Sequence, residues 1–272
     1  MPGKVNNQLS DILFTFVKSI KMESAQTWFK DWFNSHYYYQ LYFKRDKKEA
    51  ANFINKLVSY LEPPQNSLML DVGCGRGRHS IDLASKGFDV TGIDLAEDSI
   101  RQAKEKENEH LHFFLHDMRL PFWINYFDYA FNFFTSFGYF NTRREHNNAI
   151  RTISESLKPD GVFVIDYFNV HFEEDHLVRE SELEIDGVIY YITKWHNSTH
   201  FYKKILIKDD KLKAALEYHE KVVKFSFGDF TEMLAYHQMQ VQEVFGDYNF
   251  ENYDVKKSPR MIIVAKKIVR KT

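Results

Sequence analysis

The segment LMLDVGCGRG, residues 68–77, constrains the fold of this chain more than any other stretch. An apolar run, Leu68 to Val72, leads into a loop with glycines at positions 73, 75 and 77, and a helical pattern follows at about 78–86. A backbone without side chains can turn sharply and approach a ligand closely. A strand, a glycine-rich loop and a helix in this order are typical of an α/β nucleotide-binding unit.

Short apolar runs and helical patterns continue to alternate after this loop. Further strands are predicted at 88–93, 111–115, 127–133 and 161–167, the last opened by a Pro159-Asp160-Gly161 turn, with helices at about 97–107 and 143–157. A later helix (229–237) and two strands (241–245 and 261–266) complete the pattern. The sequence therefore predicts an α/β fold, a Rossmann-like core with a mostly parallel, seven-stranded sheet.

Two additions to this core are expected. Helical spacing between Trp28 and Leu61 predicts two helices separated by HYYYQLYFKRD, residues 36–46, which form an N-terminal cap. Alternating segments between 177 and 225 predict an antiparallel β insert after the fifth strand. The expected division is an N-terminal arm and cap (1–62), a cofactor-binding core (63–172), the insert (173–226) and a C-terminal completion of the core (227–272). Residues 9–20 are interpreted as an amphipathic arm, a packing helix or a loose leader.

Composition excludes several classes of protein. With 36 Lys and Arg against 38 Asp and Glu, and no long stripe of one sign, charge does not favour a nucleic-acid partner. No run of about 18 apolar residues predicts a membrane span. A single cysteine excludes a disulfide framework and favours the cytoplasm, and no metal site is expected, since His110, His112 and His116 alternate on one strand face without carboxylate or cysteine partners. No oligomeric state follows from the sequence.

An acid stands beside the glycine loop. Asp71 precedes a G-x-G-x-G spacing, whereas the dinucleotide fingerprint is G-x-G-x-x-G and presents its amides to a pyrophosphate. A carboxylate at this place would repel pyrophosphate and suits a cationic ligand, which disfavours a nicotinamide dehydrogenase. Asp94 ends the next strand, 23 residues further on, where an α/β site accepts ribose hydroxyls, and Leu95 would lie against the base. The alternative is that such strand-end acids only cap the following helix.

These motifs resemble those of the class I S-adenosylmethionine-dependent methyltransferases. The resemblance implies that Asp71 and the loop backbone hold the methionine portion of the cofactor, that Asp117 accepts the adenine amino group and that Met118 supplies an adjoining backbone contact. Cys74 is interpreted as a small residue that fills the loop. The full set of expected cofactor contacts is Asp71, Gly73, Cys74, Gly75, Gly77, Asp94, Leu95, Asp117, Met118 and Phe134.

The methyl acceptor is expected near FFTSFGYF, residues 133–140, because ligands of open α/β sheets lie beyond the carboxyl ends of the strands. Tyr139 is the first candidate for touching the acceptor, with Thr135 and Ser136 beside it; the alternative is that this loop is packed by its own aromatic residues. Asp166 and Asn169 end the fifth strand and either bind substrate or cap the strand's exit. No Pro-Pro-aromatic motif is present, which disfavours methylation of base amines, and Cys74 lies in the wrong loop to attack a pyrimidine carbon.

The flanking segments resemble bacterial small-molecule methyltransferases of the glycine/sarcosine N-methyltransferase-like type, over roughly residues 28–268. This resemblance suggests a closed acceptor pocket lined by Tyr38, Tyr42, Arg45, Tyr248 and Arg260. The predicted function is methyl transfer from S-adenosylmethionine to nitrogen or oxygen of a small molecule, by in-line displacement with the enzyme positioning the acceptor. The alternatives are an RNA or protein methyltransferase and a cofactor-binding module without catalysis.

Overall fold

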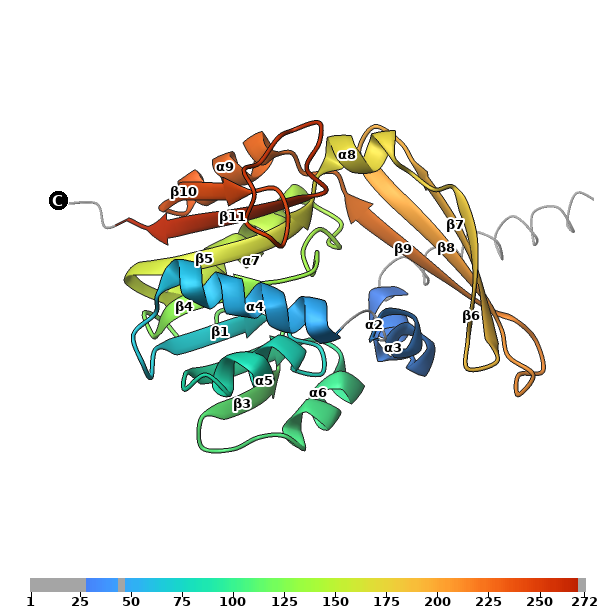
Figure 1. Ribbon diagram of the computed structural model, residues 1–272, viewed down its shortest axis with the longest axis horizontal. Helices are drawn as coiled ribbons and strands as arrows, with labels where there is room; N and C mark the ends of the chain where they lie inside the picture. Colours follow the sequence, from blue (N-terminus) through green and yellow to red (C-terminus); the bar gives the residue numbers. More distant parts are fainter. Residues whose placement is uncertain (1–27, 44–46, 269–272) are drawn as a thin grey trace, which may run out of the picture.

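The computed structural model describes residues 28–43 and 47–268, and within them the side chains of 31–42 and 50–268. Its main sheet has seven strands in the order β10-β11-β5-β4-β1-β2-β3 (Figure 1). The strands are β1 (Leu68–Val72), β2 (Asp89–Asp94), β3 (Leu111–Leu115), β4 (Phe127–Asn132), β5 (Leu157–Phe168), β10 (Met239–Phe245) and β11 (Arg260–Lys267). Only β11 runs antiparallel to its two neighbours. The predicted mostly parallel, seven-stranded sheet is confirmed.

Helices cover both faces of this sheet. They are α4 (Lys47–Leu61), α5 (Arg78–Ala84), α6 (Glu97–Lys104), α7 (Arg143–Ser156) and α9 (Phe227–Tyr236). Apolar residues of α7 and α9 pack with one face, and those of α4, α5 and α6 pack with the other. Both α7 and α9 begin with a capping box, in which the N-cap side chain and an acid three residues later satisfy each other's backbone N–H groups.

The cap and the insert form a second body beside the core (Figure 1). The insert is an antiparallel sheet of β6 (Glu180–Ile185), β7 (Val188–His196), β8 (His200–Lys208) and β9 (Leu216–Val223). The cap consists of α2 (Trp28–Asn34) and α3 (His36–Phe43). Trp32 and Leu41 of the cap are buried against Tyr190, Ile205 and Ile207 of the insert, in a hydrophobic cluster separate from those of the core. The predicted antiparallel insert is confirmed.

The structure corrects several predicted elements. The segment 36–43 is itself the helix α3, because Leu41 and its neighbouring tyrosines pack on the insert, so the cap region and α4 contain three helices rather than two. Strand β5 begins at Leu157, and the predicted turn lies inside it, where the register with β4 shifts and Asp160 has a φ of 63°. A short helix, α8 (Val170–Asp175), was not predicted. Residues 9–20 lie outside the described part of the chain.

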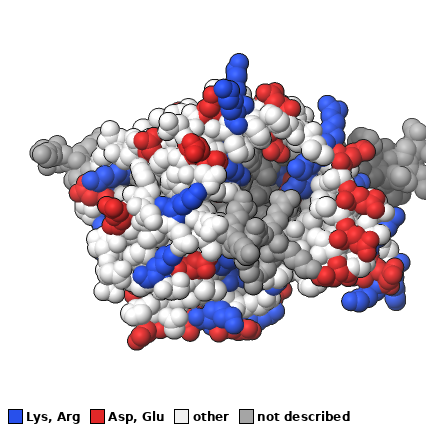
Figure 2. Space-filling model, in the orientation of Figure 1, with Lys and Arg blue, Asp and Glu red and all other residues white. Residues whose placement is uncertain are grey.

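The surface charge of the described residues is mixed on the face seen in Figure 2. Lys and Arg side chains are interspersed with Asp and Glu over the core, and acidic side chains gather over the insert. Strand β6 contributes exposed Glu180, Glu182 and Glu184 at the outer edge of that sheet. Within the described ranges, no helix has the length and apolar character that crossing a membrane requires.

Candidate active site

The glycine loop joins the end of β1 to the start of α5, and each of its glycines has a positive φ. The values are 77° at Gly73, 56° at Gly75 and 78° at Gly77. A Cβ at Gly73 would lie 2.7 Å from the Cβ of Ser136, and one at Gly77 would lie 2.3 Å from the ring of Phe113. A Cβ at Gly75 would meet nothing within 4 Å. Two of the glycines therefore permit close packing, whereas Gly75 leaves space above the loop.

Asp94, the last residue of β2, is tied to this loop. Its carboxylate accepts the backbone N–H of Gly75 at 2.7 Å and that of Ala96 at 2.8 Å. Burial raises the pKa of Asp94, and these backbone N–H groups oppose the rise. A carboxylate offers about four acceptor sites. Sites therefore remain on Asp94 for the hydroxyls of a ligand.

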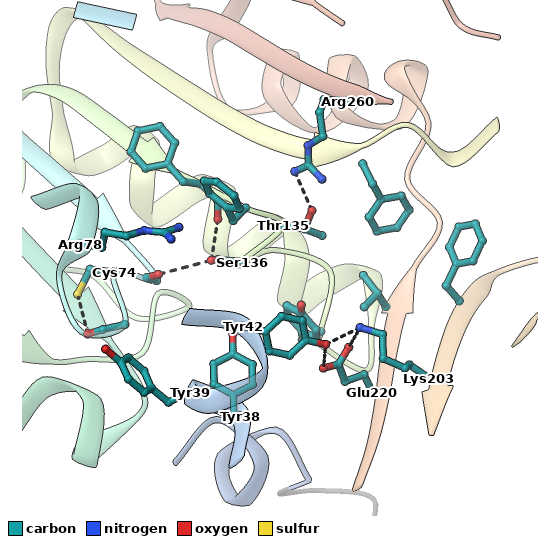
Figure 3. A pocket seen from close by; sticks show the side chains of 18 of the residues that line it. Tyr38, Tyr39, Tyr42, Cys74, Arg78, Thr135, Ser136, Lys203, Glu220 and Arg260 are labelled. Atoms are coloured by element: carbon teal, nitrogen blue, oxygen red, sulfur yellow. Dashed lines mark hydrogen bonds and ion pairs between the residues drawn. The ribbon is translucent and has the colours of Figure 1, made fainter. Parts of the chain in front are cut away.

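A cleft with two lobes opens above the loop, and Figure 3 shows the larger one. The larger lobe has a volume of about 580 Å³ and the smaller one about 130 Å³. The residues that line both lobes are Tyr38, Gly73, Gly75, Ser99, Phe134, Thr135, Ser136 and Tyr139. The lobes thus meet at the glycine loop and at the loop after β4, as expected for a cofactor and an acceptor that must touch.

The smaller lobe combines an apolar slot with acidic groups. Leu95 and Met118 line it, together with Asp94 and Asp117. Arg119 donates to Asp117 through Nε at 3.0 Å and Nη2 at 2.6 Å. Burial would raise the pKa of Asp117, but the hydrogen bonds and charge of Arg119 lower it overall. An ionised acid beside apolar walls suits an adenosine group.

All four tyrosines of the predicted acceptor site, Tyr38, Tyr42, Tyr139 and Tyr248, line the larger lobe. Tyr38 and Tyr42 come from α3 (Figure 3), and Tyr139 comes from the loop after β4. The ring of Tyr139 stands edge-on to Phe33, with centroids 5.3 Å apart. Burial raises the pKa of the Tyr38, Tyr42 and Tyr139 hydroxyls, and the carboxylate of Glu220 raises it further. These phenols therefore stay protonated at neutral pH.

The loop after β4 holds two consecutive residues in the left-handed region, Phe134 at a φ of 53° and Thr135 at 59°. Such a conformation costs about 1–2 kcal/mol per residue without glycine. The carboxylate of Asp166 accepts the Phe134 N–H at 2.9 Å, and its carbonyl accepts the Thr135 N–H at 3.0 Å. Arg260 donates to Asp166 at 2.8 Å and to the Thr135 hydroxyl at 3.0 Å. These bonds fix the loop after β4, at which the two lobes meet.

Two predicted cofactor contacts lie behind the cleft wall. Asp71 is buried and accepts a hydrogen bond from the hydroxyl of Ser80 at 2.6 Å. Burial raises the pKa of Asp71 to about 7, with a further contribution from Asp94, although Ser80 opposes it. Gly77 forms the left-handed N-cap of α5 against Phe113. Neither residue lines a lobe, because both are used to seat the loop on the core.

The predicted acceptor residues at the end of β5 also do not reach the cleft wall. Asp166 is completely buried beneath Arg260 and Tyr248, which line the larger lobe. Asn169 caps α8 through the N–H of His171 and donates to two carbonyls of the segment before β11. The capping alternative therefore describes Asn169. Arg45 lies outside the described residues.

Three residues in the glycine loop or directly after it, Arg76, Arg78 and His79, line the larger lobe and were missed in the sequence. The guanidinium carbon of Arg76 lies 3.2 Å from the ring centroid of Tyr39, and its buried Nε has no partner among the described residues. Arg78 lies over the ring of Phe134 at 5.0 Å. Burial and the neighbouring Arg78 lower the pKa of His79 to about 3, so its ring is neutral. Their place beside the loop was an available signal.

A polar cluster on the insert side was also missed. Glu220 of β9 accepts hydrogen bonds from Trp32 at 2.8 Å, Tyr42 at 2.6 Å and Lys203 at 2.7 Å, and Figure 3 shows the last two. Lys203 donates as well to the Tyr42 hydroxyl. Burial alone would raise the pKa of Glu220, but Lys203 and the hydrogen bonds lower it. We call these four residues the Glu220 cluster; Tyr42, Lys203 and Glu220 line the larger lobe.

The donor set of the cleft fits S-adenosylmethionine. Asp94 has acceptor sites for ribose hydroxyls, Leu95 and Met118 form a slot for adenine, and the space above Gly75 admits a chain between the lobes. The Rossmann-like sheet and this cleft define an enzyme of the class that binds an adenosine-containing, cationic cofactor. A family model described as a methyltransferase domain matches residues 65–206. The chain belongs to this family and is a class I S-adenosylmethionine-dependent methyltransferase.

Similar proteins agree with this assignment. A protein of Geobacillus sp. (strain WCH70) named as a methyltransferase is 28% identical over 226 residues, which cover 79% of this chain and 91% of that protein. The dTDP-3-amino-3,4,6-trideoxy-alpha-D-glucopyranose N,N-dimethyltransferase of Streptomyces venezuelae is 33% identical over 124 residues, 45% of this chain. The match spans 51% of the length of that sugar enzyme. The crystal structure of an S-adenosylmethionine-dependent methyltransferase from Clostridium acetobutylicum shares the fold, with a TM-score of 0.73, 18% identity and coverage of 86% of this chain and 97% of that one.

Proposed function

We propose that this enzyme transfers a methyl group from S-adenosylmethionine to a nitrogen or oxygen atom of a small molecule. The observation that carries the proposal is the arrangement of the cleft, in which a small slot beside Asp94 and Asp117 meets a larger aromatic lobe at Gly75 and Tyr139. Nitrogen is favoured, because the similar sugar enzyme is named an N,N-dimethyltransferase.

In this proposal the smaller lobe holds the adenosine group. Asp94 accepts the ribose hydroxyls, Asp117 accepts the adenine amino group, and Leu95 and Met118 contact the adenine. The backbone of Gly73, Cys74 and Gly75 faces the methionine portion, and Phe134 lies beside it. Asp71 acts one layer further back, by holding Ser80 and thereby the start of α5. When bound, the cofactor supplies a methyl group already activated by its sulfonium.

The larger lobe holds and aligns the acceptor. Its aromatic walls exclude water, and well-oriented reactants gain effective molarities of about 10⁵ to 10⁸ M. Tyr139 stands where the two lobes meet, and its protonated hydroxyl donates to the acceptor and orients it toward the methyl group. Thr135 and Ser136 contribute hydroxyls to the same wall. Orientation of the acceptor is therefore the principal task of these side chains.

A small acceptor is supported over a macromolecule by the shape and the charge of the protein. The larger lobe is lined by Tyr38 and Tyr42 of the cap and by Lys203 and Glu220 of the insert (Figure 3). The face seen in Figure 2 presents interspersed charges over the core and exposed acids on β6. These acids at the outer edge of the insert would repel a nucleic acid. A cytoplasmic location, expected from the single cysteine, belongs to the same proposal.

Calorimetric titration with S-adenosylmethionine and, separately, with NAD tests the cofactor. Release of S-adenosylhomocysteine in the presence of small amines, small alcohols, transfer RNA and a protein extract then tests the acceptor class. We expect binding of S-adenosylmethionine and turnover with small amines. Preference for NAD, or turnover with RNA or protein alone, would contradict the proposal.

A further inference from the structure

The Glu220 cluster places one unused donor and one unused acceptor in the wall of the larger lobe. Lys203 has three N–H groups and donates two of them, to Tyr42 and Glu220. Within the described part of the chain, its third N–H has no partner. Glu220 accepts two hydrogen bonds at Oε1 and one at Oε2, so Oε2 retains an acceptor site. A cation and an anion thus present a vacant donor and a vacant acceptor side by side.

This pair is rigidly held. The Glu220 side chain is 9% exposed and that of Lys203 is 21% exposed. Trp32 and Tyr42 of the cap donate to the carboxylate from one side, while β8 and β9 pair through Lys203 and Glu220 themselves. Because the donors and acceptors are preorganised, a ligand group that matches both would bind without ordering these side chains.

The charged side chains that the insert and β11 contribute to the larger lobe are paired. Besides Lys203 and Glu220, Lys194 lies 3.8 Å from Glu173, and Arg260 lies 2.7 Å from the buried carboxylate of Asp166. A ligand carboxylate that approaches Lys203 would be repelled by Glu220, and a ligand ammonium that approaches Glu220 would be repelled by Lys203. A hydroxyl, which donates and accepts at once, satisfies both groups.

The remaining walls suit the apolar face of a ring. Phe168, Phe201 and Tyr202 line the larger lobe, together with Tyr42 and Tyr139. Aromatic walls with a few fixed polar groups are the usual make-up of a small-molecule site. Stacking against such walls buries ring CH groups while the ring's hydroxyls turn toward the polar groups.

We infer that the acceptor is a hydroxylated cyclic amine, in which a hydroxyl near the reacting nitrogen donates to Glu220 and accepts from Lys203. This inference rests on the proposed methyl transfer to a small molecule and specifies its substrate class. It makes Lys203 and Glu220 specificity-determining residues. An amino acid, whose carboxylate needs an unpaired cation, fits this wall poorly.

The probes are trans-2-aminocyclohexanol and cyclohexylamine, which differ by one hydroxyl, and glycine. Their dissociation constants are measured by calorimetry on the full-length protein loaded with S-adenosylhomocysteine. We expect the amino alcohol to bind about tenfold more tightly than cyclohexylamine, as hydrogen bonds to charged groups imply, and glycine to bind more weakly than either. In the double variant Lys203→Met with Glu220→Gln, which retains an acceptor for Trp32 and Tyr42, the two amines should bind within about twofold of each other.

Lys204→Met is the matched control, because Lys204 is the next residue of β8 and pairs with the exposed Glu217. It should keep the tenfold preference. Equal affinities of the two amines in the native protein, absence of binding of either, or a preference that survives the double variant would each overturn the inference. The comparison of the two amines on the native protein tests the inference even if the double variant does not fold. Failure of the proposed function would show separately, as absence of S-adenosylmethionine binding to the native protein.

Discussion

The carboxylate of Asp166, at the end of β5, accepts the backbone N–H of Phe134 at 2.9 Å, in a loop that leaves the neighbouring strand β4. The residue that receives this support has a φ of 53°. The same carboxylate binds the guanidinium of Arg260, whose side chain is partly exposed in the larger lobe. A single buried anion therefore holds a strained loop and a cation together at the junction of the two lobes.

Removal of the Asp166 carboxylate should release both the loop after β4 and the side chain of Arg260. Asp166→Ala leaves Arg260 and the Phe134 N–H without their acceptor, and breaking a buried pair costs about 3–5 kcal/mol. Urea unfolding should show a loss of this size, and calorimetry should show weaker binding of S-adenosylmethionine. Asp175→Ala, at the end of the neighbouring helix α8, is the control, because that side chain is exposed and its substitution should change stability by less than about 1 kcal/mol. Equal effects of the two substitutions would contradict the role assigned to Asp166.

A second prediction concerns Asp94. Asp94→Ala removes the acceptor of Gly75 N–H and the proposed acceptor of the ribose hydroxyls. Loss of hydrogen bonds to a carboxylate should weaken binding of S-adenosylmethionine by about 1–3 kcal/mol, measured by isothermal titration. Asp89→Ala, at the other end of β2, should leave the affinity unchanged. An Asp94→Ala protein with native affinity would remove Asp94 from the cofactor site.

Substitutions at two glycines of the loop should differ in their effects on stability and on cofactor binding. Gly73→Ala places a Cβ 2.7 Å from Ser136 at a φ of 77° and should lower the free energy of unfolding by more than the 1–2 kcal/mol typical of a left-handed alanine. Gly75→Ala meets open space, so its stability loss should stay near that strain value while cofactor affinity falls. Thermal melts and titrations on both variants make the comparison. A Gly75→Ala protein that binds the cofactor normally would place the cofactor elsewhere.

The buried carboxyl of Asp71 should make stability depend on pH. Its pKa is raised to about 7 by burial, above an unfolded value near 4. Between about pH 4 and 7 this carboxyl therefore holds more of a proton in the folded state than in the unfolded state, and its contribution to the free energy of unfolding falls as the pH rises. The amide that replaces this carboxyl in the Asp71→Asn variant cannot titrate. The free energy of unfolding of this variant, relative to that of the native protein, should therefore rise from pH 4 to 7 and then level off. Urea unfolding at several pH values tests this, and a constant difference would contradict the raised pKa.

The Glu220 cluster should stabilise the contact between cap and insert. Glu220→Ala leaves Lys203, Trp32 and Tyr42 without their shared acceptor, which should cost about 3–5 kcal/mol. Glu217→Ala, on the exposed face of the same strand, should cost less than about 1 kcal/mol. Urea unfolding followed by tryptophan fluorescence compares them, and a Glu220→Ala loss as small as the control's would show that other contacts hold the cap.

The sequence predicts the core of this protein well, because its information there is local. The loop at 68–77 and the strand-end acids Asp94 and Asp117 stand in a fixed order along one edge of a parallel sheet, so their proximity follows from the topology. The same reasoning fails for Asp166, whose partner Arg260 lies 94 residues away. Its burial is decided by a side chain on a strand that sequence periodicity does not connect to it.

The insert side of the cleft could be read only in part. Glu220 lies on the same face of β9 as Tyr218 and Val222. An acid at such an inward-facing strand position indicates that a polar or charged partner is present. Which partner it has depends on Trp32 and Tyr42, which are 188 and 178 residues away in the sequence. The helical character of 36–43 was missed for the same reason, since its tyrosines find their surroundings on the insert.

The separate hydrophobic cluster of cap and insert has a consequence for how such an enzyme could diversify. Because Trp32 and Leu41 pack with Tyr190 and Ile205 rather than with the core, changes there need not disturb the sheet that carries Asp94. A graft that moves only the insert would expose the apolar side of α2 and α3, and one that moves only these helices would uncover the sheet. A change of acceptor preference would therefore require the cap helices and the insert to be exchanged together. These two stretches lie more than a hundred residues apart in the sequence, and each covers the apolar surface of the other.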